Sequence, residues 1–166
     1  MVLIIDGHNL IPHLPGVDLS DPDDEVKLVQ LLQGYCRIHH KRAEVFFDRA
    51  PAGMAGVRQY GLVRAHFVRE GTTADAAIMA YLKKLGKRAK NTTVVSSDRQ
   101  VLAAARGARA GMIRSEAFAG AWAQLAEDEP ELDPRNRLLD EKEVADWEQL
   151  FRRGHPARGD ENKYNK

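Results

Sequence analysis

Short apolar runs that end in an aspartate are the feature that most constrains the fold of this chain. Val2–Ile5 is an uninterrupted apolar run followed directly by Asp6. Such runs are typical of strands buried on both faces, as in a parallel sheet. Two further strands are predicted over Ala43–Phe47 and Thr93–Ser96, and acidic residues follow both of them. The pattern therefore predicts a buried, mainly parallel sheet.

Helical patterns separate the predicted strands. Asp21 and Pro22 predict a helix start, with Asp21 as the cap and Pro22 at the first helical position. This helix is expected to run to about His39 and to bury one face, formed by Leu28, Leu31, Leu32 and Tyr35. A second helix is predicted after the caps Thr72 and Thr73, with a core face formed by Ile78, Tyr81, Leu82 and Leu85.

Two less regular strands complete the expected sheet. Leu62–Val68 is predicted to be an edge strand with one wet face, because Arg64 and His66 alternate with apolar residues. Ala110–Ile113 is a short last strand, which follows an alanine-rich helix that stops at Gly107. The predicted fold class is therefore α/β, with an open, mainly parallel five-stranded sheet flanked by helices on both faces.

The C-terminal quarter of the chain is more polar. We expect a helix from Ser115 to about Ala126, an acidic linker over 127–134 and an amphipathic helix over 140–153. Residues 1–154 are predicted to form a single domain, and 155–166 a disordered polar tail. Trp122 and Trp147 lie on apolar helix faces and are expected in the core.

Composition limits the classes of function. The net charge is +1, but residues 37–69 carry seven Lys and Arg against two acids, which predicts either a basic face or solvated helix surfaces. A single cysteine excludes a disulfide framework and a cysteine-based zinc site. The apolar N-terminal run is too short for a signal or a membrane span, so we expect a cytoplasmic protein with no membrane partner. Glycine-rich phosphate-binding motifs are absent from the sequence.

Four aspartates are expected to converge at one edge of the sheet, because ligands of open parallel sheets bind beyond the carboxyl ends of the strands. Asp6, Asp48 and Asp98 follow predicted strands, and Asp75 opens a helix. Clustered carboxylates repel one another unless a cation binds or some are protonated, and oxygen ligands suit Mg²⁺ or Mn²⁺. Such ions can activate water against a phosphodiester.

Each of these residues also has a structural interpretation. Asp6 could belong to a turn, Asp75 could complement a helix dipole, and Asp98 could cap a helix. Asn9 could orient Asp6, contact a phosphate or form an Asx turn. Ser97 could bind a phosphate or a ligating carboxylate, or satisfy the end of its strand.

Several motifs resemble those of the YacP-like NYN-domain ribonucleases, a group within the PIN-like superfamily. Ile4–Ile11 is similar to the opening motif, and Phe46-Phe47-Asp48 to the second. Thr73-Ala74-Asp75 with Ile78 resembles the third, Ser97-Asp98 the fourth, and 143–154 the closing helix. The resemblance implies a PIN-like sheet, metal-dependent RNA cleavage and catalytic roles for Asp6, Asp75 and Asp98, with Asp48 as a further metal ligand.

The chain departs from this pattern at two positions. His8 stands where the opening motif usually has Tyr, and Met79 stands where many relatives carry Glu. The missing acid leaves two hypotheses: an endoribonuclease that uses Mg²⁺ or Mn²⁺, and a non-catalytic RNA- or ribosome-binding module. A phosphoacceptor domain is a third hypothesis, but the paired acids and the lysine that it requires are absent.

The expected partner is RNA, in the first place mRNA, with the ribosome as an alternative partner. The protein is expected to be a monomer or a weak homodimer. Basic residues from two clusters are predicted to guide the RNA backbone: Arg49, Arg58, Arg64, Arg69, Lys83, Lys84 and Lys87.

Overall fold

A six-stranded, mainly parallel sheet runs through the computed structural model, which describes residues 1–50 and 53–128. The strand order is β3-β4-β2-β1-β5-β6, and β3 is antiparallel to β4 while the other neighbours are parallel. The strands are β1 (Val2–Asp6), β2 (Arg42–Ala50), β3 (Gly56–Tyr60), β4 (Val63–Arg69), β5 (Thr92–Val95) and β6 (Gly111–Ile113).

Strand β1 lies at the centre of the sheet, as the apolar run predicts. Ile5 is fully buried and pairs with Val45 of β2 on one side and Val95 of β5 on the other. Full burial of such a side chain contributes about 1.5–3 kcal/mol, so the central strands anchor the sheet. The carboxyl end of β1, which carries Asp6, is therefore held rigidly between two neighbours.

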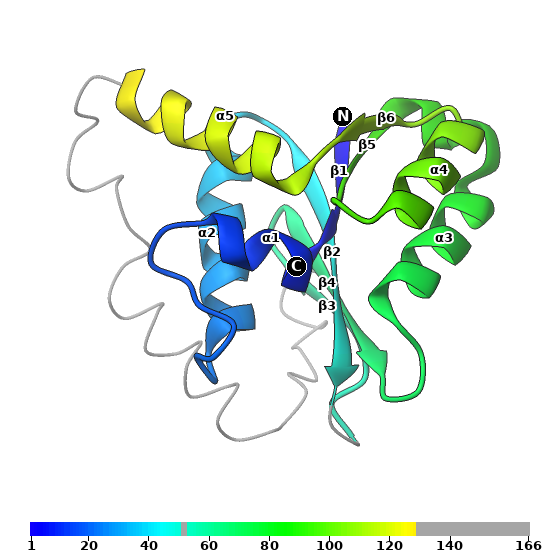
Figure 1. The fold of residues 1–166 in the computed structure, drawn as a ribbon, viewed down its shortest axis with the longest axis horizontal. Helices are drawn as coiled ribbons and strands as arrows, with labels where there is room; N and C mark the ends of the chain where they lie inside the picture. Colours follow the sequence, from blue (N-terminus) through cyan, green and yellow to red (C-terminus); the bar gives the residue numbers. More distant parts are fainter. Residues whose placement is uncertain (51–52, 129–166) are drawn as a thin grey trace, which may run out of the picture.

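Helices cover both faces of the sheet (Figure 1). Helices α1, α2 and α5 lie on one side, and α3 and α4 lie on the other. The helices are α1 (Gly7–Leu10), α2 (Asp24–Ile38), α3 (Ala74–Leu85), α4 (Arg99–Gly107) and α5 (Ser115–Asp128), with 3-10 turns η1 (Ile11–His13) and η2 (Gly86–Asn91). The α/β prediction is confirmed, with one strand more than expected.

Alternation of side chains along the strands produces two hydrophobic cores. Ile5 and Phe47 pack on the side of α2 and α5, whereas Ile4 and Phe46 pack on the side of α3 and α4. Trp122 packs against the first core beside Tyr35, with ring centroids 4.9 Å apart, so its predicted core position is confirmed.

The sixth strand corrects the prediction that the strand over Leu62–Val68 is an edge. β3 pairs antiparallel with β4 and occupies the edge instead, while the side chains of β4 still alternate between buried and exposed. Gly61 has a φ of 59° in the two-residue turn between the strands, a left-handed conformation typical of tight hairpins. Sequence patterning missed β3 because its five residues include Arg58 and Gln59 and form no apolar run.

Two expectations for α2 were wrong. The helix begins at Asp24 rather than at Pro22, because Asp21 instead forms a preceding turn in which its side chain accepts from the backbone N–H of Asp23 at 2.9 Å. Leu31, predicted in the core, has 40% of its surface exposed. The buried face of α2 is rotated toward Val29 and Cys36.

Predictions for the later elements agree with the structure. Thr73 caps α3 by accepting from the backbone N–H of Ala76 at 3.1 Å, and α4, β6 and α5 lie close to their expected positions. The acidic linker, the helix predicted over 140–153 and the tail over 155–166 fall outside the described residues. Within the described part of the chain, no helix combines the length and the apolar character needed to cross a membrane.

Candidate active site

Asp6 is the most buried of the predicted site residues. It ends the central strand, its residue surface is 6% exposed, and the carboxylate of Asp75 in the first turn of α3 adjoins it. The pKa of Asp6 is raised to about 7, mainly by burial and then by a side-chain hydrogen bond with Asp75 and the negative charge of Asp75. A hydrogen bond from the backbone N–H of Asn9 opposes the increase, and the charge of Asp48 adds least to it. The structure therefore confirms that Asp6 and Asp75 come together at one edge of the sheet.

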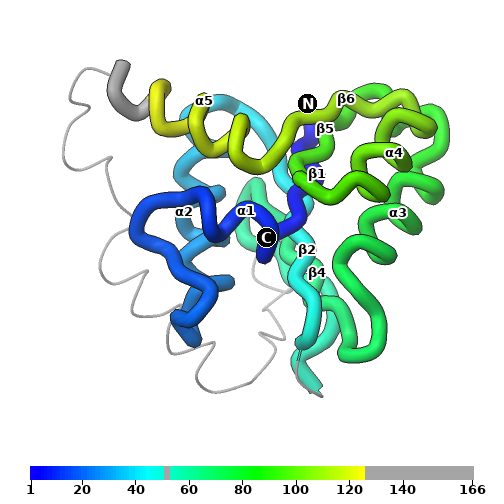
Figure 2. Tube along the Cα trace, viewed as in Figure 1, coloured from blue at the N-terminus to red at the C-terminus, as the bar shows by residue number. Residues whose placement is uncertain are grey.

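The chain turns into α1 directly after Asp6, which Figure 2 shows as a sharp change of direction at the end of β1. A Cβ atom on Gly7 would lie 2.3 Å from Cε1 of the buried Phe47 ring. Only glycine permits this close approach, so the Asp6-Gly7 pair sets the position from which α1 leaves the sheet. The sequence did not predict α1.

Asp48 lies within β2 rather than after it. The strand continues to Ala50 through a β-bulge: Phe47 pairs with Phe67, but Ala50 pairs with Arg69, so β2 has one extra residue. Arg49 in this bulge has a φ of 58°. Bulges redirect side chains, and here Oδ1 of Asp48 lies 2.7 Å from Nδ1 of His8.

His8 connects Asp48 to a residue that sequence reasoning missed. Its Nε2 lies 3.1 Å from Oε1 of Glu25 in the first turn of α2. The hydrogen bond to Glu25, followed by that to Asp48, raises the pKa of His8 to about 9, although burial opposes the increase. A protonated His8 then donates to both carboxylates. Glu25 lies 17 residues away in the sequence, and its spacing gave no signal of this contact.

Asn9 links three segments near the site. Its side-chain oxygen accepts from the backbone N–H of Ser97 at 2.8 Å and from the hydroxyl of Ser115 at 2.6 Å. Asn9 thereby holds the loop after β5 and the start of α5 against α1. Ser115 is fully buried, and sequence reasoning treated it only as the start of a helix.

Ser97 is engaged by protein groups. Its hydroxyl donates to Glu116 and accepts from the backbone N–H of Ser115 at 3.2 Å. Hydrogen bonds from Ser97 and Arg114 lower the pKa of the exposed Glu116 to about 2. This network fixes Ser97 in the loop between β5 and α4, while the backbone N–H of Asp98 donates to the hydroxyl of Ser96 at 3.1 Å.

Asp98 caps α4, as its structural interpretation predicted. Oδ1 accepts from the backbone N–H groups of Gln100 at 2.8 Å and Val101 at 3.1 Å. Oδ2 has no hydrogen-bond partner among the described residues, so capping leaves one oxygen of Asp98 available to a ligand. Asp98 can therefore cap α4 and still offer an oxygen to a metal ion.

The four aspartates lie at the same edge but are not equivalent. Asp6 and Asp75 form a pair, whereas Asp48 is engaged by His8 and Asp98 by helix α4. An ionised Asp6 beside Asp75 is electrostatically unfavourable in a buried site, and a divalent cation would relieve the repulsion. The donor atoms are all oxygens, so the residues present fit Mg²⁺ or Mn²⁺.

The arginines among the predicted RNA-binding residues fall into two groups. Arg58 stacks over the Phe67 ring at 4.9 Å and Arg64 contacts Glu44 at 3.4 Å. Both side chains therefore already have partners within the sheet. Arg49 and Arg69 are exposed beside the bulge that carries Asp48.

Lys83 and Lys84 lie at the far end of α3 from Asp75, and Lys87 lies in the 3-10 turn η2 that follows. At 1.5 Å per residue, Lys83 is about 12 Å along the helix from Asp75. Lys83 and Lys87 line a groove of about 880 Å³ between α3 and α4, together with Met79 and Arg109. The structure thus separates these lysines from the aspartate pair.

Comparisons with known proteins agree with this architecture. A family model described as the YacP-like NYN domain matches residues 3–152. Crystal structures of Rae1 (YacP) from Bacillus subtilis and of a mutant of that protein are similar, with TM-scores of 0.60 and identities of 21% and 19%. The matches cover 93% and 90% of this chain and 95% and 99% of those chains, respectively. No curated protein sequence matches the chain significantly.

Proposed function

The chain belongs to the YacP-like NYN domain family, and on this basis we propose that it is a metal-dependent endoribonuclease that hydrolyses RNA phosphodiester bonds. One observation carries the proposal: the buried Asp6 carboxylate adjoins Asp75 at the carboxyl end of the central strand, and its pKa is raised to about 7. Perturbed carboxylates of this kind are concentrated at functional sites.

Asp6 and Asp75 are proposed to hold Mg²⁺ or Mn²⁺, with the free oxygen of Asp98 as a further ligand. When bound, the ion supplies Lewis-acid activation of the phosphodiester and of a water molecule. Asp48 is proposed as a more peripheral ligand, because His8 already occupies its Oδ1.

Protein groups around the pair have supporting roles. Asn9 fixes the loop that carries Ser97 and Asp98 relative to Asp6, so it sets the spacing of the carboxylates. Arg49 and Arg69 are proposed to contact the RNA backbone beside the bulge, with Arg58 and Arg64 as secondary contacts. Lys83, Lys84 and Lys87 would extend RNA binding along α3, away from the cleavage position.

A cleavage assay tests the proposal. Purified full-length wild type and the Asp6→Asn and Asp75→Asn variants are incubated with end-labelled single-stranded and structured RNAs and Mn²⁺. Both variants are expected to lose at least about 100-fold of the cleavage rate, because even outer-sphere changes at metal sites cost 10–100-fold.

Asp23→Asn is the matched control, because Asp23 precedes α2 and its side chain makes no capping hydrogen bond. This variant is expected to cleave at the wild-type rate. Equal cleavage by wild type and Asp6→Asn, or no cleavage by wild type of any RNA, would overturn the proposal.

A second function is favoured by Met79. This residue lies one turn after Asp75 on α3 and lines the groove with Lys83 and Lys87, so no acid supports Asp75 from that position. The alternative is a non-catalytic RNA- or ribosome-binding module. It predicts tight, salt-sensitive RNA binding by wild type without cleavage or metal binding.

We further propose that residues 1–154 act as one domain in the cytoplasm, with mRNA as the first expected substrate. The monomeric or weakly dimeric state also stays a prediction, which sedimentation of the purified chain would test.

A further inference from the structure

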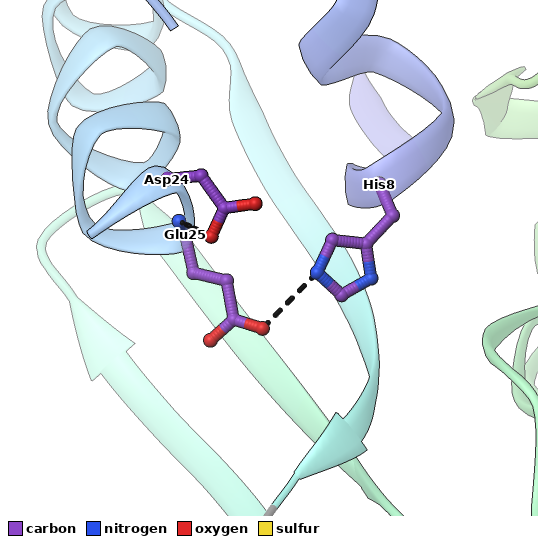
Figure 3. A group of neighbouring side chains, drawn as sticks. All are labelled: His8, Asp24 and Glu25. Carbon is purple, nitrogen blue, oxygen red and sulfur yellow. Dashed lines mark hydrogen bonds and ion pairs between the residues drawn. The ribbon is translucent and has the colours of Figure 1, made fainter. Parts of the chain in front are cut away.

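A second group of metal-ligating side chains lies between α1 and α2. One ligand atom from each of His8, Asp24 and Glu25 lies within 4.8 Å of the others. Figure 3 shows the Glu25 carboxylate meeting the His8 ring across the space between the two helices, where Nε2 and Oε1 are 3.1 Å apart. Two ligands bound to one ion at 2.0–2.1 Å with a tetrahedral angle are about 3.3 Å apart, so this spacing suits a shared cation.

Asp24 supplies an independent indication of a ligand. It is 7% exposed, and its Oδ1 accepts only from the backbone N–H of the next residue, Glu25, at 2.7 Å. Its other oxygen has no hydrogen-bond partner within the described residues, and Figure 3 shows an Asp24 carboxylate oxygen on the side that faces His8. One carboxylate oxygen of this largely buried residue is therefore engaged by no donor of the described residues and is open to solvent or to a cation.

Asp48 orients His8 from outside the group. Its Oδ1 lies 2.7 Å from Nδ1 of His8, so the Nδ1–H donates to Asp48 and Nε2 is directed toward Glu25. Metal-binding histidines commonly have such a carboxylate on the second ring nitrogen, which fixes the tautomer and the ring orientation. Asp48 and His8 thus form the carboxylate–histidine arrangement that a cation at Nε2 would extend.

We propose that His8, Asp24 and Glu25 form a second cation site, selective for Zn²⁺, Co²⁺ or Mn²⁺ over Mg²⁺. One imidazole with two carboxylates is a donor set of borderline transition metals, whereas Mg²⁺ prefers oxygen ligands alone. A bound ion would join α1 to the first turn of α2 and would hold His8 against Asp48. The site is distinct from the Asp6–Asp75 pair and does not depend on RNA cleavage.

Zn²⁺ binding to the metal-stripped, full-length chain tests the site. Nitrogen-15 resonances of the histidine rings are recorded during a Zn²⁺ titration, and His8→Gln identifies the His8 signals. The Nε2 resonance of His8 is expected to shift with one equivalent of Zn²⁺, and an equal concentration of Mg²⁺ is expected to leave it unchanged.

Calorimetric Zn²⁺ titrations of variants supply the second readout. His8→Gln and Glu25→Gln are expected to lose at least about tenfold in affinity, whereas the matched neighbour Asp23→Asn keeps the wild-type affinity. Unmoved His8 resonances, or unchanged affinity in a folded His8→Gln variant, would show that His8 and Glu25 form only an ion pair. Loss of Zn²⁺ binding at His8 in the Asp6→Asn variant would likewise overturn the proposal. If Glu25→Gln does not fold, the wild-type resonances decide.

Discussion

Replacing Asp6 with Asn should stabilise the metal-free protein at neutral pH. Folded protein holds the Asp6 proton up to about pH 7, whereas the unfolded chain releases it near the ordinary value of 3.8. The native state therefore binds more protons between these values, and the free energy of unfolding falls as the pH rises through this range. Asn has nearly the same shape as Asp and cannot ionise, so the free energy of unfolding of the variant does not fall in this way as the pH rises.

The magnitude follows from the size of the shift. An increase of roughly three pKa units corresponds to about 4 kcal/mol at 1.36 kcal/mol per unit, which is an upper limit. Entry of water and movement of Asp75 reduce the effect, so we expect Asp6→Asn to be more stable by about 1–3 kcal/mol at pH 8. At pH 5, only about one unit above the ordinary value of 3.8, less than half of this loss has accumulated, so the difference should be less than half of that at pH 8.

Urea denaturation followed by circular dichroism, with a chelator present, measures this difference at both pH values. Asp23→Asn is the control and should match wild type at each pH. Addition of Mn²⁺ should raise the stability of wild type more than that of Asp6→Asn, because binding to the folded state alone stabilises it. A variant that is less stable than wild type at pH 8, or a difference equal at pH 5 and pH 8, would show that ionisation of Asp6 does not destabilise the folded protein.

Three further predictions concern the surroundings of Asp6. Gly7→Ala should cost about 1–3 kcal/mol in urea denaturation, because its Cβ would lie 2.3 Å from the buried Phe47 ring; wild-type stability would contradict this. Asp98→Asn should keep the cap of α4 but lose RNA cleavage, whereas Asp98→Ala should also lose about 0.5–2 kcal/mol; equal cleavage by Asp98→Asn and wild type would exclude Asp98 from the site. His8 stabilises the metal-free fold fully below about pH 6.5, and this contribution of about 1–2 kcal/mol should disappear as the pH rises through 9. If the stability of Glu25→Gln, measured by thermal unfolding, has the same pH dependence as that of wild type, the ion pair between His8 and Glu25 does not stabilise the fold.

Local sequence patterns predicted the parallel strands of the sheet and the edge at which the candidate aspartates lie, but they missed β3. The side chains of an uninterrupted apolar run are all buried only where other elements cover both faces of the strand. Val2–Ile5 therefore indicated a strand at the centre of a parallel sheet. The rule that site residues follow the carboxyl ends of such strands then located Asp6 and Asp98, and the helix cap at Thr73 located Asp75.

Contacts between distant residues could not be predicted in this way. Asn9 contacts Ser97 and Ser115 across separations of 88 and 106 residues, and these bonds depend on how α1 and α5 pack. The bulge that turns Asp48 toward His8 depends on the left-handed conformation of Arg49, for which its residue type gives no signal. Glu25 was missed because a helix-opening acid ordinarily faces solvent.

An anomalous diffraction map from crystals soaked in Mn²⁺ would show directly whether Asp6 and Asp75 bind a cation. We expect a Mn²⁺ peak in contact with the carboxylates of both Asp6 and Asp75, at roughly the 2.0–2.2 Å expected of oxygen ligands. A second peak at His8, Asp24 and Glu25 would agree with the further site. A map with no peak at Asp6 and Asp75, in crystals whose other sites bind Mn²⁺, would contradict the assignment of this pair as the metal centre.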